Sequence, residues 1–360
     1  MRTGRGTAAV AALLATALGA AGCDSAASAH HQDPGRTAAA AAGQPRPVPH
    51  GRGSRVPYDF NGDGHRDLVV NDLAKRDSYA DDAGIAVVYG TGSAARPLDP
   101  GVRQVLTTRR DAAPVGGRPP ATFDAEAACD LDGDGFSDLI VTTDPPYDGV
   151  GRPPVPLQIL FGGPGGLTGR AVVLGIPDRA RWGNDWPDHP VCGDFDGDGA
   201  TDLAVTATGG RVSFLRGPFR RTGAPRAAGP SLPGGGPVLE APAPRADVNG
   251  DGYDDLVVRA SAAPGARGRL LLGGPDGPAR PGGAAAPVRR PVPPAAALPG
   301  SGPAPVTEVL DHADLTGDEV ADLVVRTHRG ATRDLVAVYR GAGRGWAAEP
   351  LVTFTTAGWG

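Results

Sequence analysis

Five short loops carry the residues of this sequence that could do chemistry. Each has oxygen-bearing side chains at its first, third, fifth and ninth positions and glycine at its fourth; the first runs from Asp59 to Leu68, and the others begin at Asp130, Asp194, Asp247 and Asp314. This spacing curls a short loop around one hard cation. A donor set made of oxygen alone indicates calcium.

The residues after each loop predict a strand. A helix–loop–helix calcium site needs a bidentate Glu at position twelve, at the start of a helix. That position is always Val (Val70, Val141, Val205, Val258, Val325), and position ten is always Leu (Leu68, Leu139, Leu203, Leu256, Leu323). Such continuous apolar, β-branched sequence is typical of a buried strand.

The loops belong to a larger repeat, because their starts lie 71, 64, 53 and 67 residues apart. A second pattern, an apolar strand that ends in glycine, recurs at Ala86–Gly90, Gln158–Gly162, Val212–Gly217, Leu270–Gly273 and Leu335–Gly341. Each unit therefore reads as strand A, the loop, strand B such as Asp67–Asn71, strand C, a glycine turn and strand D. Four strands make a blade, and blades around an axis bury their faces on one another.

The loops, together with the Phe-Gly-Gly-Pro-Gly-Gly-Leu segment at Phe161–Leu167, resemble the FG-GAP/VCBS repeats of integrin-α-like proteins over residues 53–360. The resemblance implies an all-β fold, a β-propeller of four-stranded blades with calcium loops between strands A and B. Integrin-type propellers have seven blades, whereas five repeats are present here. We favour five closed blades, with six or seven as alternatives. Ser54–Tyr58 is a short candidate for the first strand A, and Ala357–Gly360 could begin another, so either end could close the ring.

The resemblance and the loop geometry together predict four to five Ca²⁺ sites. The ligands are the side chains at positions one, three, five and nine and the backbone carbonyl at position seven. They are Asp59, Asn61, Asp63, His65, Asp67; Asp130, Asp132, Asp134, Phe136, Asp138; Asp194, Asp196, Asp198, Ala200, Asp202; Asp247, Asn249, Asp251, Tyr253, Asp255; and Asp314, Thr316, Asp318, Val320, Asp322.

The five sites are expected to differ in affinity. Loops two and three have four aspartates each, and their extra charge predicts tighter binding. Loop five is expected to be the weakest or empty, because Thr316 replaces a carboxylate or amide and Glu319 replaces a glycine suited to positive φ. Extracellular calcium modules bind with Kd of ~10⁻⁴–10⁻³ M. A site with Kd ~0.1 mM in ~1 mM calcium stabilises folding by about 1.4 kcal/mol, so a structural role suffices to explain the aspartates.

The N-terminus predicts export. Residues 1–23 read as a lipoprotein signal in which Cys23 would become the lipidated residue, with simple secretion as the alternative. Residues 24–52 are of low complexity and predict a flexible tether, in which His30 and His31 could bind a stray metal. The propeller would fill residues 53–360. The chain is therefore expected to be lipid-anchored at the outer face of the cell membrane, or secreted.

After export the cysteines Cys129 and Cys192 remain, each just before a calcium loop. In an oxidising compartment they could form a disulfide between neighbouring inner strands or stay as two buried thiols. The formal net charge of −5 comes mostly from ligand carboxylates. The sequence has no stripe of basic residues that would indicate nucleic-acid binding.

Catalytic motifs are absent from the sequence: there is no Gly-x-Ser-x-Gly elbow, no His-Glu-x-x-His and no phosphate loop. His189, His312 and His328 are scattered among the blades and read as loop or strand residues. We therefore predict that the chain is not an enzyme.

The face opposite the calcium loops is predicted to bind a ligand. Long connections from the first three blades emerge there, at Asp72–Asp82, Arg109–Pro120, Asp144–Pro154 and Ile176–Trp186. Their aromatic and charged residues suit ligand contact; these are Lys75, Tyr79, Tyr147, Arg179, Arg181, Trp182, Asp185 and Trp186. The alternative is that Trp182 and Trp186 pack between blades.

The sequence thus favours a monomeric, calcium-stabilised propeller that binds a glycan or protein outside the cell. A polysaccharide lyase is an alternative, because some related propellers cleave sugars with calcium and a few charged residues. A scaffold in envelope assembly is another.

Overall fold

Nearly all regular elements of the structure are antiparallel strands. It is a computed structural model that describes residues 43–79, 84–144, 154–263, 265–287, 291–294, 298, 302–343 and 345–359. Cys23, His30, His31 and Tyr147 lie outside the described residues, as do the signal and most of the tether. Two four-residue helices, α1 (Thr108–Asp111) and α2 (Asp178–Arg181), interrupt the connections. Neither these nor any other helix of the described part is long and apolar enough to cross a membrane.

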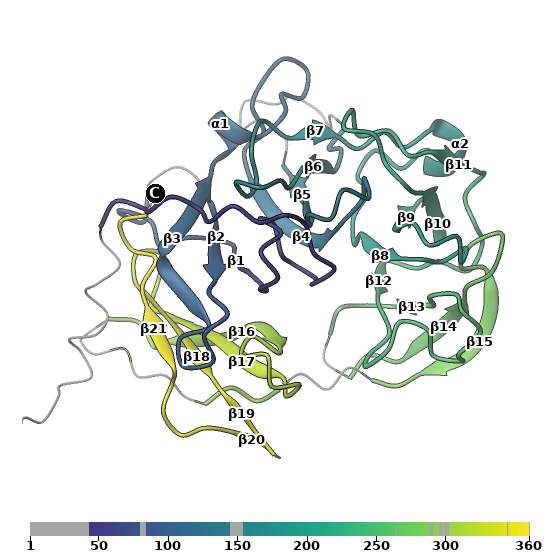
Figure 1. The fold of residues 1–360 in the computed structure, drawn as a ribbon. Coiled ribbons are helices and arrows are strands. Elements are labelled where there is room, and N and C mark those ends of the chain that lie inside the picture. The colour runs from purple at the N-terminus through teal and green to yellow at the C-terminus, as the bar shows by residue number, and fades with distance from the viewer. Residues whose placement is uncertain are drawn as a thin grey trace, which may run out of the picture. The chain divides into compact units, whose positions relative to one another are not determined.

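Five sheets, named here blades one to five, follow one another along the chain, as the expected β-propeller requires (Figure 1). Blade one contains β1 (Leu68–Val70), β2 (Ile85–Gly90) and β3 (Leu98–Leu106). Blade two contains β4 (Phe123–Cys129), β5 (Asp138–Thr143), β6 (Gln158–Leu160) and β7 (Val172–Val173). Blade three contains β8 (Val191–Gly193), β9 (Asp202–Ala207), β10 (Arg211–Arg216) and β11 (Ala227–Ala228).

The last two blades follow the same order. Blade four contains β12 (Val238–Glu240), β13 (Leu256–Arg259), β14 (Gly268–Leu272) and β15 (Arg280–Ala285). Blade five contains β16 (Val306–Ala313), β17 (Asp322–His328), β18 (Asp334–Tyr339) and β21 (Val352–Phe354), with the hairpin β19 (Gly341–Ala342) and β20 (Gly345–Trp346) inserted. The predicted strands B and C thus form as expected.

Blade one has three strands because its expected strand A does not form. Residues 54–58, the predicted candidate, contain no strand. The C-terminal end does not supply it either. β21 completes blade five, and the Trp359 ring stacks on Phe354 with 5.5 Å between the ring centroids. Blades one and five meet instead through a buried apolar cluster that includes Val88, Val338 and Trp359.

Apolar clusters join most neighbouring blades. Blade one packs on blade two around Val87 and Val141, blade two on three around Ile159 and Val205, and blade three on four around Phe214. Among the described residues no such cluster joins blade four to blade five. The described residues of blades four and five thus provide no packed apolar junction for the expected closure of five blades.

A disulfide also ties two of the blades together. It joins Cys129 on β4 to Cys192 on β8, with 6.4 Å between the two Cα atoms, and so links the inner strands of blades two and three.

Residues 43–52, which the sequence assigned to the tether, lie against blade one. The backbone N–H of Arg46 donates to the Gly101 carbonyl at 2.7 Å, and the backbone N–H of Arg52 donates to the Gly62 carbonyl at 3.0 Å. The tether as predicted is therefore too long at its C-terminal end, because these backbone groups pair with the blade.

Candidate metal centres and the opposite rim

The first aspartate of each loop organises the turn. In loop one, Asp59 Oδ1 accepts hydrogen bonds from the backbone N–H groups of Gly62 (2.7 Å) and Asp63 (3.2 Å), while its Oδ2 accepts from Gly64 (2.7 Å). Asp130, Asp247 and Asp314 accept from the equivalent N–H groups, and Asp194 accepts from the sixth position. The loop therefore closes around one carboxylate, which brings its other oxygens towards a common centre.

The ninth aspartate ties the loop to the end of strand C. Asp67 is buried; one oxygen accepts from the Phe60 N–H at 2.9 Å and the other from the Gly90 N–H at 2.8 Å. The same bond to the glycine that ends strand C recurs from Gly162 to Asp138, Gly217 to Asp202, Gly273 to Asp255 and Gly341 to Asp322, at 2.8–3.0 Å. The two repeating patterns of the sequence, the loop and the strand-end glycine, are thus two halves of one joint.

The glycine in this joint is required by close approach. A Cβ atom at Gly162 would lie 2.3 Å from the carbonyl oxygen of Ser137, the eighth residue of loop two. At the other four strand ends it would lie 2.0–2.7 Å from the carbonyl oxygen of the eighth residue of the same blade's loop. Real Cβ atoms essentially never come this close to another heavy atom, so any side chain here would separate strand C from the loop.

Replacing this glycine is expected to destabilise the fold strongly. Gly162→Ala should lower the free energy of unfolding by about 3 kcal/mol, because the clash is with backbone and cannot be relieved by a rotamer change. Gly163→Ala is the matched control, since a Cβ there meets only the Gly166 carbonyl oxygen, at 4.0 Å. Urea titration of the two variants measures the difference. Equal stability of both would contradict the close-approach explanation.

The donor atoms fit a hard divalent cation. Asn61 Oδ1, Asp132 Oδ1 and Asp196 Oδ1, all from the third position, and Asp194 Oδ1 from the first are buried without a hydrogen-bond partner. In loops two and three the carboxylate oxygens of positions one, three and nine lie within 4.8 Å of one another. Burial of a carboxylate without a partner is costly, so these oxygens are arranged for a ligand that supplies positive charge.

The ninth aspartates show the same electrostatic cost in their pKa values. Burial raises the pKa of Asp138 to about 8 and that of Asp202 to about 7, and neighbouring aspartates of each loop add to the effect. Burial likewise raises the pKa of Asp67 well above its usual range. A divalent cation at these loops would offset the repulsion and hold the carboxylates ionised.

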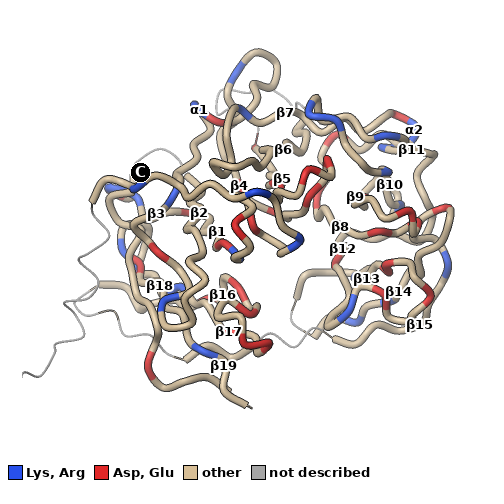
Figure 2. The backbone as a smooth tube through the Cα atoms, viewed as in Figure 1, with Lys and Arg blue, Asp and Glu red and all other residues tan. Residues whose placement is uncertain are grey.

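Arginines partly neutralise loops two to five. Arg221 contacts Asp132 at 2.9 Å and Asp134 at 2.5 Å, and both Arg216 and Arg226 pair with loop three. Arg280 and Arg340 pair with the fifth positions of loops four and five. Figure 2 shows acidic segments recurring along the blades with arginines beside them. These arginines offset part of the extra charge on which the predicted tighter binding of loops two and three rests.

Loop five departs from the others in its backbone. Glu319 has φ of +65°, in the left-handed region, where the other four loops have glycines with φ of +84° to +88°. A side chain in that region costs about 1 kcal/mol, which glycine does not incur. The sequence-based expectation of a weak fifth site therefore has a backbone reason as well as a ligand reason.

Relieving this strain is expected to stabilise the blade. Glu319→Gly should raise the free energy of unfolding by about 1 kcal/mol, as measured by chemical denaturation. Glu319→Ala removes the same charge but keeps a Cβ at positive φ, so it should give no such gain. A gain of equal size in both variants would assign the effect to charge instead of backbone strain.

The loops also join neighbouring blades. The second residue of loop one is Phe60, whose buried ring lies in the cluster shared with blade two, and its carbonyl accepts from the Gly163 N–H of blade two at 3.2 Å. Leu131 and Phe195 accept equivalent bonds from the next blade, at 2.7 and 3.0 Å. In loop four the second residue, Val248, is 51% exposed, which agrees with the missing cluster after blade four. Order in the loops is therefore coupled to packing between blades.

On the opposite rim, the connection from blade two to blade three exposes two tryptophans. Trp182 is 57% exposed and Trp186 is 44% exposed, so the alternative that both rings pack between blades is wrong. The backbone N–H of Trp186 donates to Asn184 Oδ1, and Asn184 Nδ2 donates to the Thr206 carbonyl of β9. The Arg211 guanidinium lies 5.0 Å from the Trp182 ring centroid. The two rings are thus presented by a segment that is fixed to blade three.

The arginines predicted for this rim have structural partners. Arg179 donates to the Ala228 carbonyl, and Arg181 pairs with both Asp178 and Asp185. Lys75 and Tyr79 belong to blade one, where the Lys75 N–H donates to the Ala331 carbonyl of blade five. The contacts therefore place Arg179, Arg181, Trp182, Asp185 and Trp186 together on blade three and leave Lys75 and Tyr79 on another blade. Tyr147 lies outside the described part.

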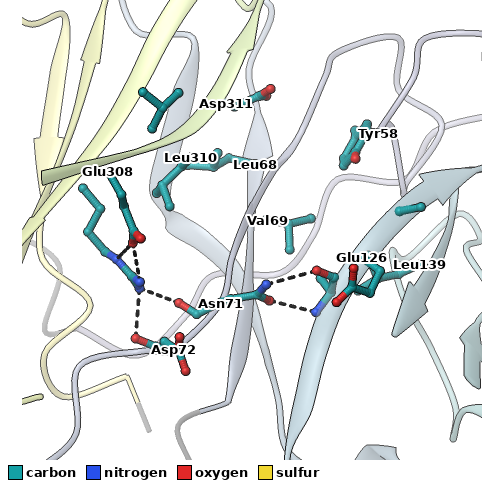
Figure 3. A pocket seen from close by; sticks show the side chains of 14 residues that line it. Tyr58, Leu68, Val69, Asn71, Asp72, Glu126, Leu139, Glu308, Leu310 and Asp311 are labelled. Atoms are coloured by element: carbon teal, nitrogen blue, oxygen red, sulfur yellow. Dashed lines mark hydrogen bonds and ion pairs between the residues drawn. The ribbon is translucent and has the colours of Figure 1, made fainter. Parts of the chain in front are cut away.

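The inner strands line a cavity of about 360 Å³ (Figure 3). Its lining includes Asn71 of blade one, Glu126 of blade two and Glu308 of blade five. Asn71 bonds the Ala125 backbone through both ends of its side chain, at 2.9 and 3.1 Å. Glu308 pairs with Arg326 at 2.5 Å. Blades one, two and five thus meet at this cavity, and blades two and five contribute glutamates to its wall.

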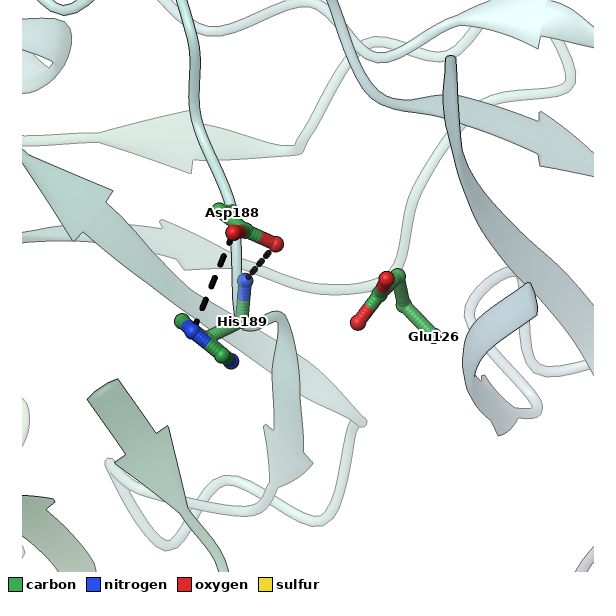
Figure 4. Close-up of side chains that lie close together, drawn as sticks. All are labelled: Glu126, Asp188 and His189. Carbon is green, nitrogen blue, oxygen red and sulfur yellow. Dashed lines mark hydrogen bonds and ion pairs between the residues drawn. The ribbon is translucent and has the colours of Figure 1, made fainter. Parts of the chain in front are cut away.

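Glu126 has close neighbours that the sequence did not predict. Its carboxylate lies beside Asp188 and His189, which precede β8, and the ligand atoms of the three side chains are within 4.8 Å of one another (Figure 4). Burial and the nearby Asp188 raise the pKa of Glu126 to about 7. The sequence treated His189 as a scattered loop residue. Its one signal, the acidic neighbour Asp188 four residues before Cys192, has meaning only once β4 and β8 are known to be adjacent.

Comparison with known proteins supports the repeat. The family model of the FG-GAP repeat matches residues 241–273, which include loop four with β13 and β14. No curated protein matches the chain.

Proposed function

We propose that this chain is an exported, calcium-stabilised β-propeller that binds a glycan or protein outside the cell, without catalysing a reaction. The observation that carries the binding role is the exposed pair Trp182 and Trp186 on the rim opposite the metal loops. Exposed aromatic rings that are held in place provide contact area at a low cost in conformational entropy. The FG-GAP repeat at residues 241–273 supports a module of the integrin-like kind.

Calcium is the cation proposed for the loops. The donors are carboxylate, amide and backbone carbonyl oxygens, with no sulfur or imidazole nitrogen among them, and calcium prefers such sets. Bound calcium would supply the positive charge that the buried third-position oxygens lack. Its role would be to fix the loops and, through residues such as Phe60 and Leu131, the junctions between blades.

Export is proposed from two observations. Residues 1–23 have the pattern of a lipoprotein signal with Cys23 at its end. The disulfide between Cys129 and Cys192 suits an oxidising compartment. Lipid attachment at Cys23 would leave the propeller at the outer face of the cell membrane.

A binding assay with a built-in test for cleavage examines this proposal. The purified chain, kept in 2 mM calcium, is incubated with a panel of polysaccharides, and both retained protein and released reducing ends are recorded. We expect retention without release. The retention should fall at least tenfold in Trp186→Ala and in Trp182→Ala. The control variant is Val248→Ala, which replaces an exposed apolar residue of loop four and should be retained as well as the native chain.

Two outcomes would contradict the proposal in different ways. Release of sugar ends would make the protein an enzyme and favour the lyase alternative. Retention that survives both tryptophan replacements would place the binding surface elsewhere. If no polysaccharide is retained, the glycan part of the proposal fails and protein ligands are tested with the same variants.

A further inference from the structure

We propose that Glu126, Asp188 and His189 form a binding site for one divalent transition-metal ion, of the zinc or manganese class, between the inner strands of blades two and three. The site is separate from the five calcium loops. It adds a mixed nitrogen and oxygen donor set to a chain whose predicted metal ligands are all oxygens.

Adjacent strands bring the three side chains together. A register shift in the pairing of β4 with β5, between Ala125 and Ala127, leaves Glu126 out of the strand ladder. Asp188 and His189 precede β8, and Pro190 separates them from the strand. In Figure 4 the Glu126 carboxylate lies across from Asp188 and His189, and their ligand atoms are mutually within 4.8 Å. One ion could therefore reach two carboxylate oxygens and an imidazole nitrogen.

The disulfide braces the site. Glu126 lies three residues before Cys129, and His189 lies three residues before Cys192. The two cysteines are bonded, with 6.4 Å between their Cα atoms. Each side of the site is therefore fixed at the same distance along its strand from a covalent link, which limits how far the donors can separate.

Threonines from the next strands anchor the two acidic residues. Thr142 Oγ1 on β5 donates to Glu126 Oε1 at 3.2 Å, and the Asp188 N–H donates to Thr206 Oγ1 on β9 at 2.9 Å. The Thr206 N–H donates back to the Asp188 carbonyl at 3.1 Å. Such outer hydrogen bonds orient metal ligands and raise their affinity.

Comparison of the repeats shows that blades four and five pair an inner-strand acid with an arginine, which blades two and three lack at that position. Thr142 and Thr206 are the thirteenth residues counted from their loop starts; the same position in blades four and five is Arg259 and Arg326. Those arginines pair with the inner-strand acids Glu240 and Glu308, both at 2.5 Å.

Glu126 and Asp188 have no such partner. Within the described residues no arginine or lysine pairs with either of them, and Asp188 Oδ2 lies 3.7 Å from His189 Nε2. Two neighbouring carboxylates without a paired arginine or lysine point to a bound metal cation.

The donor set selects the type of ion. Imidazole with carboxylates suits zinc, manganese and other first-row ions, whereas calcium prefers oxygen alone. The Asp188 and His189 side chains are 50% and 31% exposed, so an ion can reach them from solvent. Three protein ligands leave at least one coordination position for water or a ligand oxygen. Glu126 also lines the 360 Å³ cavity, which gives such a ligand a place to enter.

Metal titration of the full chain in excess calcium tests the site. All proteins in the titration carry His30→Ala and His31→Ala, which removes the adjacent histidine pair of the N-terminal segment. Calcium at 5 mM keeps the loops from competing for the added metal. We expect one zinc ion to bind by calorimetry with a Kd in the micromolar range, and Co²⁺ to give one visible absorption signature that zinc abolishes.

The variants separate the site from other donors. His189→Asn removes the imidazole while keeping a residue type that tolerates the positive φ of +49° at this position, and it should weaken zinc binding at least a hundredfold. Glu126→Gln should weaken it at least tenfold. His50→Ala, an exposed histidine elsewhere, should leave binding unchanged. Calcium-dependent melting of each variant checks that the fold is intact.

Three results would overturn the inference. These are no saturable zinc binding in calcium, zinc binding that survives His189→Asn, and displacement of the bound zinc by millimolar calcium.

Discussion

Chelation of calcium is expected to lower the free energy of unfolding of this protein by about 6 kcal/mol. Four occupied loops, each with Kd ~0.1 mM in ~1 mM calcium, contribute about 1.4 kcal/mol apiece. The loops also carry the hydrogen bonds between blades, for example from Gly163 to Phe60 and from Phe219 to Leu131. Loss of the ions should therefore loosen blade junctions together with the loops. A loss of this size is a large part of the stability of an ordinary domain.

Thermal unfolding in 2 mM calcium, in EGTA and after calcium is restored measures this effect. We expect a large, reversible fall in melting temperature that magnesium does not prevent, because magnesium demands a smaller, more rigid site. Asp196→Asn keeps an oxygen donor of the kind found naturally at Asn61 and should weaken the calcium response only slightly, whereas Asp196→Ala should weaken it more. Asp276→Asn, an exposed aspartate outside the loops, is the control. An unchanged melting temperature in EGTA would refute the structural role of calcium.

Removal of the disulfide is expected to cost about 4 kcal/mol. Cys129 and Cys192 are separated by 63 residues in sequence, and cross-linking a loop of that length restricts the unfolded chain by about this much. The bond also joins the inner strands of two blades that share a buried apolar cluster. Both effects favour the folded state of blades two and three.

Denaturant titration of Cys129→Ala/Cys192→Ala against the native chain, with and without reductant, measures the loss. The native chain in reductant should approach the stability of the double variant, and the double variant should not respond to reductant. Calcium is held constant in all samples, because the loops contribute separately. A difference below about 1 kcal/mol between the native chain and the double variant would mean that packing alone holds these blades.

Much of the fold could be predicted from sequence because its signals are local. The loop requires oxygen and glycine at fixed positions over ten residues. The β-branched run after each loop specifies strand B. These features depend on hydrogen bonds and backbone conformations that neighbouring residues decide.

Other predictions failed where distant segments had to meet. Residues 54–58 read as a strand but form none, and residues 43–52 read as a tether but pair with blade one. Trp182 and Trp186 could equally have packed between blades, and only the arrangement of blade three leaves them exposed. Closure between blades four and five could not be read from repeat spacing, because it depends on which apolar faces find a partner.

The sequence by itself therefore determined the repeated unit, the turn of each loop and the strands that follow, since each rests on residues close together in the chain. The tertiary structure alone decided which blades pack, and it bonded Cys129 to Cys192. It also placed Glu126 beside Asp188 and His189, because it brings together strands that are about 60 residues apart in sequence.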